Sequence, residues 1–362
     1  MLDVSLAHVS FARGDFALHD INLTFPASTH TAIAGPPASG TTTLLDLIAG
    51  KIRPSSGEIR FGTRVVNDVG ESRRPLLHVT SSLDVPERWS VRHALVAAVR
   101  RRTLDRIDRQ REYDLAIEKW KLGALAVRTI RTLSSSERTL VHLARIELLR
   151  PGILVADRLL EHLNAAALDE VADAFFRTLR VAGTTVISAP SARAELGATD
   201  RVVVLAAGRV VQQGTAAQIY AEPLDEASAL ATGSVNAIPV TVNGTTVDSI
   251  IGTWDVDHPP FQGSGVALVR PEAFSIARPG EESDLIVAVE EATFESGRWL
   301  VHALLSGGIT LRVSLPAEVR MHKGKLLALS CAAANFPLIE RSVEAPPTSV
   351  PTDAIPPMSS SR

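Results

Sequence analysis

The stretch that decides the fold runs Gly35-Pro36-Pro37-Ala38-Ser39-Gly40-Thr41-Thr42-Thr43, and it follows a strand-like apolar run at residues 29–34. After it, a helical pattern continues through Ala49. A glycine-containing loop between a strand and a helix turns successive backbone N–H groups inward, and the helix N-terminus adds partial positive charge. These features predict an anion-binding loop, although the same residues also fit an ordinary turn between a strand and a helix.

The loop is close to the phosphate-loop pattern, which is Gly, four residues, Gly, Lys, then Ser or Thr. Gly35, Gly40 and Thr42 match this pattern, whereas Thr41 stands at the position of the lysine. We expect the loop to contact phosphates through its backbone and hydroxyl groups, at Gly35, Ala38, Ser39, Gly40, Thr41, Thr42 and Thr43.

Length and composition limit the other function classes. With 362 residues, the chain is expected to form two domains rather than one. The formal net charge of −3 disfavours binding to nucleic acid through general attraction to phosphates. No apolar run approaches the length of a membrane span, and the N-terminus lacks the pattern of a signal peptide, so a cytoplasmic location is expected. The single cysteine, Cys331, excludes an internal disulfide.

The domain organisation follows from changes in the apolar pattern. Short strand-like runs alternate with helical segments through the first two thirds of the chain, which favours an α/β fold with a largely parallel sheet. These runs are residues 30–34, 76–79, 152–156, 184–188 and 201–206. We expect an α/β domain over 1–234 with a helical insert at about 90–150, an all-β domain over 235–342, and a disordered tail over 343–362.

Further motifs stand in a fixed order along the chain. They are the opening strands at 9–11 and 18–23, the run Ser55-Ser56-Gly57-Glu58-Ile59, the segment 133–138, the segment 151–157, the hairpin at 199–211, and the segment 266–272. From Leu2 to about Glu340, this order resembles the ATP-binding subunit of ABC transporters, in particular the importer class with a C-terminal β domain that is typical of carbohydrate (maltose-type) importers.

The resemblance implies a P-loop ATPase domain with an inserted helical subdomain, followed by a small OB/TOBE-like β domain. It implies ATP and Mg²⁺ as cofactors, with Thr42 and Asp157 at the metal. It also implies composite sites in a head-to-tail dimer, in which the phosphate loop of one subunit faces the signature segment of the other. The expected location is the inner face of the cell membrane, bound to two membrane-spanning permease subunits.

Three positions depart from what the resemblance implies for hydrolysis. Arg158 follows Asp157, where the family has the glutamate that activates water, and an arginine cannot accept a proton in that role. Thr80 replaces the glutamine that senses the γ-phosphate, and Pro190 replaces the switch histidine. With Thr41 in place of the lysine, these departures predict a degenerate ATPase. Arg158 is either a solvated surface arginine or a cation that approaches the phosphates from the side opposite the loop.

Two other parts of the expected site also differ from the family pattern. Arg13 holds the position of the aromatic residue that stacks on adenine, with Phe16 as a substitute. In the signature segment, Ser135 and Ser136 replace two glycines and bring Cβ atoms toward the partner's phosphate. Ser134 is expected to contact that phosphate, and Glu137 places a negative charge beside it.

Three functions are open at this point. In the first, a non-hydrolysing importer subunit for a sugar or related solute pairs with a conventional ABC ATPase subunit, or with itself. A periplasmic or surface solute-binding protein then contributes indirectly. In the second, the chain is a slow ATPase that uses Asp157 and Thr42. In the third, it is a soluble regulator that acts through the β domain.

Overall fold

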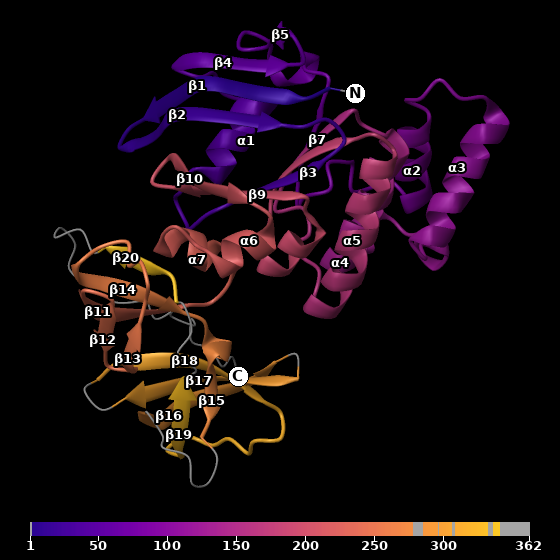
Figure 1. Cartoon of the computed structure of the whole chain (residues 1–362). Coiled ribbons are helices and arrows are strands. Elements are labelled where there is room, and N and C mark those ends of the chain that lie inside the picture. Colours follow the sequence, from indigo (N-terminus) through magenta and orange to yellow (C-terminus); the bar gives the residue numbers. More distant parts are fainter. Residues whose placement is uncertain (1, 278–284, 296, 306–307, 332–335, 341–362) are drawn as a thin grey trace. The chain divides into compact units, whose positions relative to one another are not determined.

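The computed structural model describes residues 2–277, 285–295, 297–305, 308–331 and 336–340. The chain divides into two compact units, residues 1–235 and 236–362 (Figure 1). The tail expected at 343–362 lies outside the described residues. No helix in the described ranges is both long enough and apolar enough to cross a membrane.

The centre of the first unit is a twisted sheet. Its strand order, among the described residues, is β10-β9-β3-β8-β7-β6. Neighbours are parallel except for β10, which pairs antiparallel with β9. The strands are β3 (His30–Ala34), β6 (Leu77–Thr80), β7 (Ile153–Asp157), β8 (Thr185–Ala189), β9 (Arg201–Ala206) and β10 (Arg209–Gly214). β3 and β8 are buried along their whole length, as expected for parallel strands covered on both faces. The expected α/β fold is confirmed.

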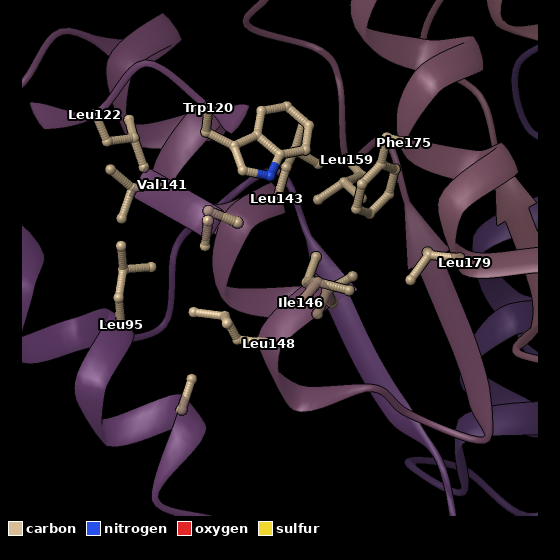
Figure 2. Close-up of a cluster of buried hydrophobic side chains, with 14 of the residues drawn as sticks. Leu95, Trp120, Leu122, Val141, Leu143, Ile146, Leu148, Leu159, Phe175 and Leu179 are labelled. Atoms are coloured by element: carbon tan, nitrogen blue, oxygen red, sulfur yellow. The ribbon is translucent and has the colours of Figure 1, made fainter. Parts of the chain in front are cut away.

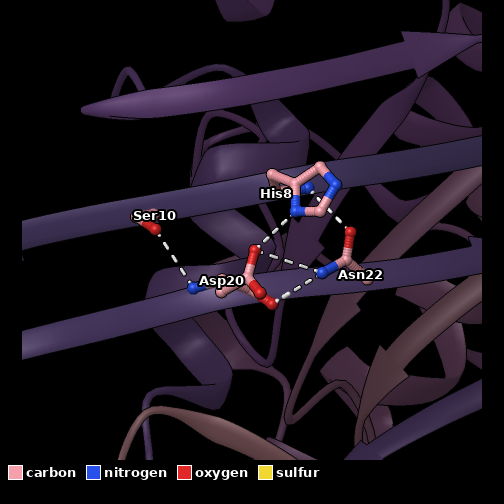
Figure 3. Close-up of polar contacts among 4 residues, drawn as sticks. All are labelled: His8, Ser10, Asp20 and Asn22. Atoms are coloured by element: carbon pink, nitrogen blue, oxygen red, sulfur yellow. Dashed lines mark hydrogen bonds and ion pairs between the residues drawn. The ribbon is translucent and has the colours of Figure 1, made fainter.

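A smaller antiparallel sheet covers part of this unit, with the order β2-β1-β4-β5. Its strands are β1 (Val4–Arg13), β2 (Phe16–Phe25), β4 (Ser56–Phe61) and β5 (Arg64–Val65). The β1–β2 register shifts near His8, and both His8 and Asp20 have positive φ, at 53° and 50°. Figure 3 shows the polar contacts that hold this irregularity: Asp20 Oδ1 lies 2.8 Å from His8 Nδ1, and Asn22 Oδ1 accepts from the His8 N–H at 2.8 Å.

The helices of the first unit fall into two groups. Those that pack on the sheet are α1 (Thr41–Ala49), α5 (Ala165–Val181), α6 (Ala216–Ala221) and α7 (Glu226–Thr232). Those within the expected insert are α2 (Val91–Val99), α3 (Arg106–Lys119) and α4 (Ser135–Leu149). Short 3₁₀ turns occur at Glu71–Arg73, Gly123–Leu125, Ile130–Thr132 and Arg193–Ala198.

The insert helices share a buried apolar cluster with α5. Figure 2 shows this cluster, in which Trp120 from the end of α3 and Phe175 from α5 meet edge to face with ring centroids 6.2 Å apart. Side-chain caps begin the insert helices: Ser90 accepts from the His93 N–H at 3.1 Å, and Asp105 accepts from the Asp108 N–H at 2.7 Å. The insert is therefore a packed part of the first unit.

The second unit consists of two antiparallel sheets in the ranges that the structure describes. The first has the order β13-β12-β11-β14-β20, and the second has the order β15-β19-β16-β17-β18. The strands are β11 (Asn236–Asn243), β12 (Thr246–Ser249), β13 (Gly252–Asp255), β14 (Gly263–Val269), β15 (Phe274–Ile276), β16 (Leu285–Glu295), β17 (Arg298–Leu305), β18 (Thr310–Pro316), β19 (Leu326–Cys331) and β20 (Leu338–Glu340), with a 3₁₀ turn at Pro271–Ala273. Buried residues alternate along β11, and both sheets contribute to one apolar core.

Candidate phosphate-binding site

The loop between β3 and α1 has an unusual backbone conformation. Ala38 and Gly40 both have positive φ, at 64° and 103°, and Gly40 is the N-cap of α1. The Ser39 N–H donates to the Pro36 carbonyl oxygen at 3.1 Å, which closes a tight turn. Ala38 adopts a conformation that glycine reaches more easily, so the loop holds this shape against a backbone preference.

Two glycines make the shape possible. A Cβ atom at Gly35 would collide with the Leu205 carbonyl oxygen, so no side chain fits there. A Cβ atom at Gly40 would lie 2.6 Å from Leu18 Cδ2 and 2.7 Å from the Phe16 ring. The loop therefore lies directly against β9 on one side and β2 on the other.

The start of α1 is suited to an anion. No side chain caps the helix, and its first turn contains no acidic residue. The first N–H groups of a helix have no partner within the helix, and they carry its partial positive charge. However, Pro36 and Pro37 have no N–H, so the first half of the loop contributes fewer donors than a loop without proline would. The loss of N–H donors at the two prolines was not considered in the sequence analysis.

A cavity of about 660 Å³ opens beside the loop. One wall is formed by the end of β3, the loop and the start of α1. The remaining lining residues come from the ends of β7 and β8, the segment that follows β8, and α7, and we call this side of the cavity the opposite wall. The predicted site residues that line the cavity are Gly35, Ala38, Thr41, Thr42, Asp157, Arg158 and Pro190. Ser39, Gly40 and Thr43 belong to the loop or to α1 but do not line the cavity.

Asp157 is the last residue of β7, where its Oδ1 atom is buried and has no hydrogen-bond partner. It shares the cavity with the hydroxyl-bearing Thr42. A carboxylate oxygen without a partner, in a cavity that a threonine also lines, fits a hard cation such as Mg²⁺, which prefers oxygen ligands and usually completes its shell with water and substrate phosphates. These two residues therefore suit a divalent ion held together with a phosphate ligand.

Arg158 and Pro190 form the opposite wall. Arg158 has a φ of 51°, and its N–H donates to the Ala189 carbonyl oxygen at 2.9 Å, which joins the ends of β7 and β8. Its guanidinium forms an ion pair with Glu161 at 2.6 Å. Pro190 directly follows β8 and has no N–H to donate. The resemblance implies a glutamate and a histidine at these two positions, and here they are occupied by an arginine and a proline.

Thr80 and Arg13 lie outside the cavity lining. Thr80 ends β6 and pairs in register with Asp157, and its hydroxyl accepts from the Ser82 N–H at 3.3 Å. Arg13 is exposed at the end of β1 and faces Phe16 across the hairpin. The Phe16 ring, rather than Arg13, reaches the loop.

The expected signature segment lies at the N-terminus of α4, also outside the cavity lining. Ser134 and Glu137 form a capping box: the Glu137 carboxylate accepts from the Ser134 N–H at 2.7 Å, and Ser134 Oγ accepts from the Glu137 N–H at 3.2 Å. The hydrogen bond from the Ser134 N–H lowers the pKa of Glu137. Ser135 is exposed, and the Ser136 hydroxyl donates to the His162 carbonyl oxygen at 2.8 Å. The start of α4 thus already holds a carboxylate of its own chain.

The sequence analysis also missed Arg74, whose side chain holds the C-terminal end of α1, the helix that begins at the loop. This side chain is only 4% exposed, and its guanidinium donates to four backbone carbonyl groups. The acceptors are Leu47 at 2.7 Å and Ile48 at 2.6 Å in α1, together with Val66 at 2.8 Å and Val69 at 2.7 Å. Burial lowers the pKa of Arg74 to about 10. A cation near the C-terminus of α1 stabilises the helix whose N-terminus faces the cavity.

A buried histidine joins the two walls beneath the cavity. His30 begins β3, and its Nδ1–H donates to the Ala198 carbonyl oxygen at 3.1 Å. Its Nε2 accepts from the Ser188 hydroxyl of β8 at 2.8 Å. Burial lowers the pKa of His30 to about 4, so the ring is neutral and both hydrogen bonds are kept at neutral pH.

Comparisons with known proteins agree with this geometry. A family model described as "ABC transporter" matches residues 18–160. The chain is 31% identical over 276 residues to the Fe(3+) ions import ATP-binding protein FbpC of Pseudomonas fluorescens, covering 75% of this chain and 77% of that protein. It is 25% identical over 331 residues to the sn-glycerol-3-phosphate import ATP-binding protein UgpC 3 of Agrobacterium fabrum, covering 90% of this chain and 93% of the other.

Solved structures support the fold of the first unit. The structure of cbiO1 from Clostridium perfringens, part of the ABC transporter complex cbiONQ, matches with a TM-score of 0.53 at 22% identity and covers 60% of this chain and 90% of its own. An ATP-binding cassette in its ADP conformation matches with a TM-score of 0.52 at 16% identity, covering 62% of this chain and 96% of its own. These structures support the fold, and the 31% identity to FbpC of Pseudomonas fluorescens over three quarters of both chains shows that the chain belongs to the ABC transporter family of ATP-binding proteins.

Proposed function

We propose that the chain is an ATP-binding subunit of an ABC importer whose own site binds nucleotide but does not hydrolyse it. The observation that carries this proposal is the cavity wall opposite the loop, where Arg158 and Pro190 stand at the ends of β7 and β8. Hydrolysis needs a group that accepts a proton from water, and neither side chain can do so. Bound ATP, with Mg²⁺, would be held by the loop, Thr42 and Asp157.

The relatives support import as the process. Their names specify two unrelated solutes, glycerol-3-phosphate and ferric ions, so the match fixes no solute for this chain. We propose a sugar or related small solute, on the basis of the resemblance of the C-terminal β domain alone. The chain would act on the cytoplasmic face of the membrane with two permease subunits, which the insert helices would contact.

Pairing with a conventional ATPase subunit follows from the same site. In a head-to-tail dimer, the partner's phosphate loop would face the start of α4, where Ser134 and Glu137 are already bonded to each other. The partner's site would then supply the chemistry, and this chain would supply the second half of the assembly. A homodimer of this chain would have no complete hydrolytic site.

The test is an ATPase assay with Mg²⁺ on the purified full chain, alone and with a conventional ABC ATPase subunit of the same transporter. We expect no turnover above background from this chain alone, and turnover from the mixture that disappears when the partner's catalytic glutamate is changed to glutamine. Robust turnover by the isolated chain would overturn the proposal.

The same assay addresses the second candidate, a slow ATPase. The shared cavity position of Thr42 and Asp157 favours it, because these residues suit a divalent ion. Turnover that is lost in Asp157→Ala would support this candidate. The third candidate, a soluble regulator that uses the β domain, would be contradicted if the chain copurified with permease subunits from detergent-solubilised membranes.

A further inference from the structure

The charges of the cavity are unevenly distributed. Among the described residues that line it, the charged side chains are Asp157, Arg158 and Arg193. All three lie on the wall opposite the loop, and two of them are cations. The loop itself contributes no charged side chain, because Thr41 occupies the lysine position. The positively charged side chains of the cavity therefore lie on the wall that does not include the loop.

The backbone of Arg158 is fixed although its side chain is accessible. Its N–H is bonded to Ala189, and its carbonyl oxygen accepts from the Glu161 N–H at 3.2 Å. The side chains of Arg158 and Glu161 are 57% and 34% exposed. An ion pair exposed to this degree contributes little to stability, because water screens it. A ligand with several negative charges can therefore compete with Glu161 for the guanidinium.

Arg193 is held by a separate set of contacts. Its Nε–H donates to the Leu230 carbonyl oxygen of α7 at 3.1 Å. Two residues after it, the buried Glu195 carboxylate accepts from the Ser191 N–H at 2.8 Å and from the Ala192 N–H at 3.0 Å. These bonds fix the segment after Pro190 against the following turn. Glu161 pairs with Arg158, and Glu195 is bonded to the segment after Pro190.

We propose that Arg158 and Arg193 bind the phosphates of a di- or triphosphate ligand from the wall opposite the loop and supply the charge that Thr41 does not. This proposal rests on the proposed function, because it concerns the same cavity. A guanidinium offers paired N–H donors that match phosphate oxygens, and it remains charged at all physiological pH values. Since a guanidinium adds charge but accepts no proton, it strengthens binding without activating water. The site is thereby suited to hold its ligand intact.

A second consequence concerns the divalent ion. Arg158 directly follows Asp157, and both residues line the cavity in which Mg²⁺ would be held. Like charges repel, and the guanidinium can itself neutralise phosphate charge. Binding of the ligand should therefore depend less on Mg²⁺ than it would in a site whose charge came from the metal.

The test is titration of a fluorescent ATP analogue into the full chain, once with Mg²⁺ and once with EDTA. Arg158→Asn removes the charge, and asparagine tolerates the positive φ at this position. We expect it to weaken binding about tenfold, as for loss of a charge-assisted hydrogen bond, and Arg193→Gln to act in the same direction. Glu161→Gln should strengthen binding, because it releases Arg158 from its partner.

The matched control is Arg177→Asn. Arg177 is also an exposed arginine paired within its own element, with Asp173 of α5, but it is outside the cavity lining. Its loss should leave the affinity unchanged. Thermal unfolding of each variant checks that the fold is kept. Unchanged affinity in Arg158→Asn, no gain in Glu161→Gln, or no measurable binding by the unmodified chain would each overturn the proposal.

Competition identifies the source of the phosphates. Tripolyphosphate is expected to displace the analogue and adenosine is not, and the reverse result would overturn the proposal. ATP that competes better than tripolyphosphate indicates a nucleotide ligand, whereas equal competition indicates that the phosphate chain alone is recognised; both results support phosphate binding by the arginines. The proposed function is contradicted by turnover or by a complete absence of nucleotide binding, whereas an affinity that is unchanged in Arg158→Asn contradicts only the role of the arginines.

Discussion

The two walls of the cavity differ in what determines them. The loop wall depends on the backbone: Gly35 lies against a carbonyl oxygen, Gly40 has a φ of 103°, and the start of α1 offers N–H groups. The opposite wall depends on side chains, and there the residues after β7 and β8 are Arg158 and Pro190. On the function proposed above, the backbone of the loop wall can hold phosphates, whereas the side chains of the opposite wall cannot activate water.

This difference separates holding a ligand from cleaving it. A backbone cradle needs only small residues and a helix start, and it binds phosphates of any kind. Cleavage needs particular functional groups at particular atoms, and replacing one of them removes the reaction while leaving the cradle intact. The two walls can therefore be tested separately.

The largest effect is expected beneath the loop wall, from Arg74→Met. This change removes four hydrogen bonds to carbonyl groups of the α1 region. The carbonyl oxygens of Leu47 and Val66 keep a second donor in the N–H groups of Gly50 and Val69, whereas those of Ile48 and Val69 lose the donor that Arg74 provides. Since each unsatisfied buried group costs about 1–3 kcal/mol, the free energy of unfolding should fall by about 3 kcal/mol or more. Urea unfolding followed by circular dichroism measures this, with the exposed neighbour Arg73→Met as the control. Equal effects of the two changes would contradict the structural role of Arg74.

Acidification should lower the free energy of unfolding through two buried histidines. Burial lowers the pKa of His30 and of His142 to about 4, whereas both are near 6.5 in the unfolded chain. Below pH 6.5 the unfolded state then binds more protons, so stability that is complete above this pH is lost as the pH falls toward about 4. At about pH 5 the loss should be about 2 kcal/mol per histidine.

The two histidines can be distinguished by mutation. His142 lies in α4, and its buried Nδ1 has no hydrogen-bond partner, so His142→Leu should remove about 2 kcal/mol of the loss at about pH 5 without weakening the fold at neutral pH. The rest comes from His30, which joins β3 to β8, and from His78, whose pKa burial also lowers. Urea unfolding at about pH 7.5 and about pH 5 measures both parts, with the exposed His19→Gln as the control. A pH dependence that His142→Leu leaves unchanged would refute this assignment.

Restoring the missing charge of the loop wall should raise affinity. A unit charge about 4 Å from a phosphate contributes about 4 kcal/mol at an effective dielectric constant of about 20, before desolvation is subtracted. We therefore expect Thr41→Lys to bind the fluorescent ATP analogue about tenfold more tightly, a gain of about 1.4 kcal/mol. Thr43→Lys, which places the same charge outside the cavity lining, is the matched control. No difference between the two would indicate that the loop does not hold the phosphates.

The smallest effect is expected from Ser136→Ala at the start of α4. It removes the hydrogen bond to the His162 carbonyl oxygen, which is a partly solvated contact worth about 0.5–1 kcal/mol. Thermal unfolding should show a small decrease relative to Ser135→Ala, the neighbouring exposed position. A larger effect of Ser135→Ala would contradict the contact.

Much of the fold could be predicted from the apolar runs, because buried parallel strands are nearly continuous in apolar residues. The predicted strands at His30–Ala34 and Arg201–Ala206 agree with β3 and β9 at both ends. β7 and β8 each begin and end one residue later than predicted, since the ladder includes Asp157, a polar residue that pairs with Ala189. β16 continues past its apolar run to Glu295, because its pairing with β17 extends the hairpin.

The site was less accessible to sequence reasoning. The loop and the residue after Asp157 could be located by motif spacing, since these positions are adjacent in the chain. Arg74 could not, because it follows Arg73 in a polar stretch where the two arginines look equivalent and only folding buries one of them. Arg193 likewise reaches the cavity through the turn after β8, which no local pattern indicates. Ser134 and Glu137 were singled out in the sequence as residues beside a phosphate, but the hydrogen bonds between them were not predicted.

The short segment from Asp157 to His162 is tied down at both ends. At one end the Arg158 N–H is bonded to the end of β8, and at the other the His162 carbonyl oxygen receives the Ser136 hydroxyl at the tip of α4. If a bound ligand moved Arg158, the hydrogen bond from Ser136 to His162 would carry that movement to the start of α4. Binding of the ligand would then affect the surface at the start of α4 without hydrolysis of the ligand.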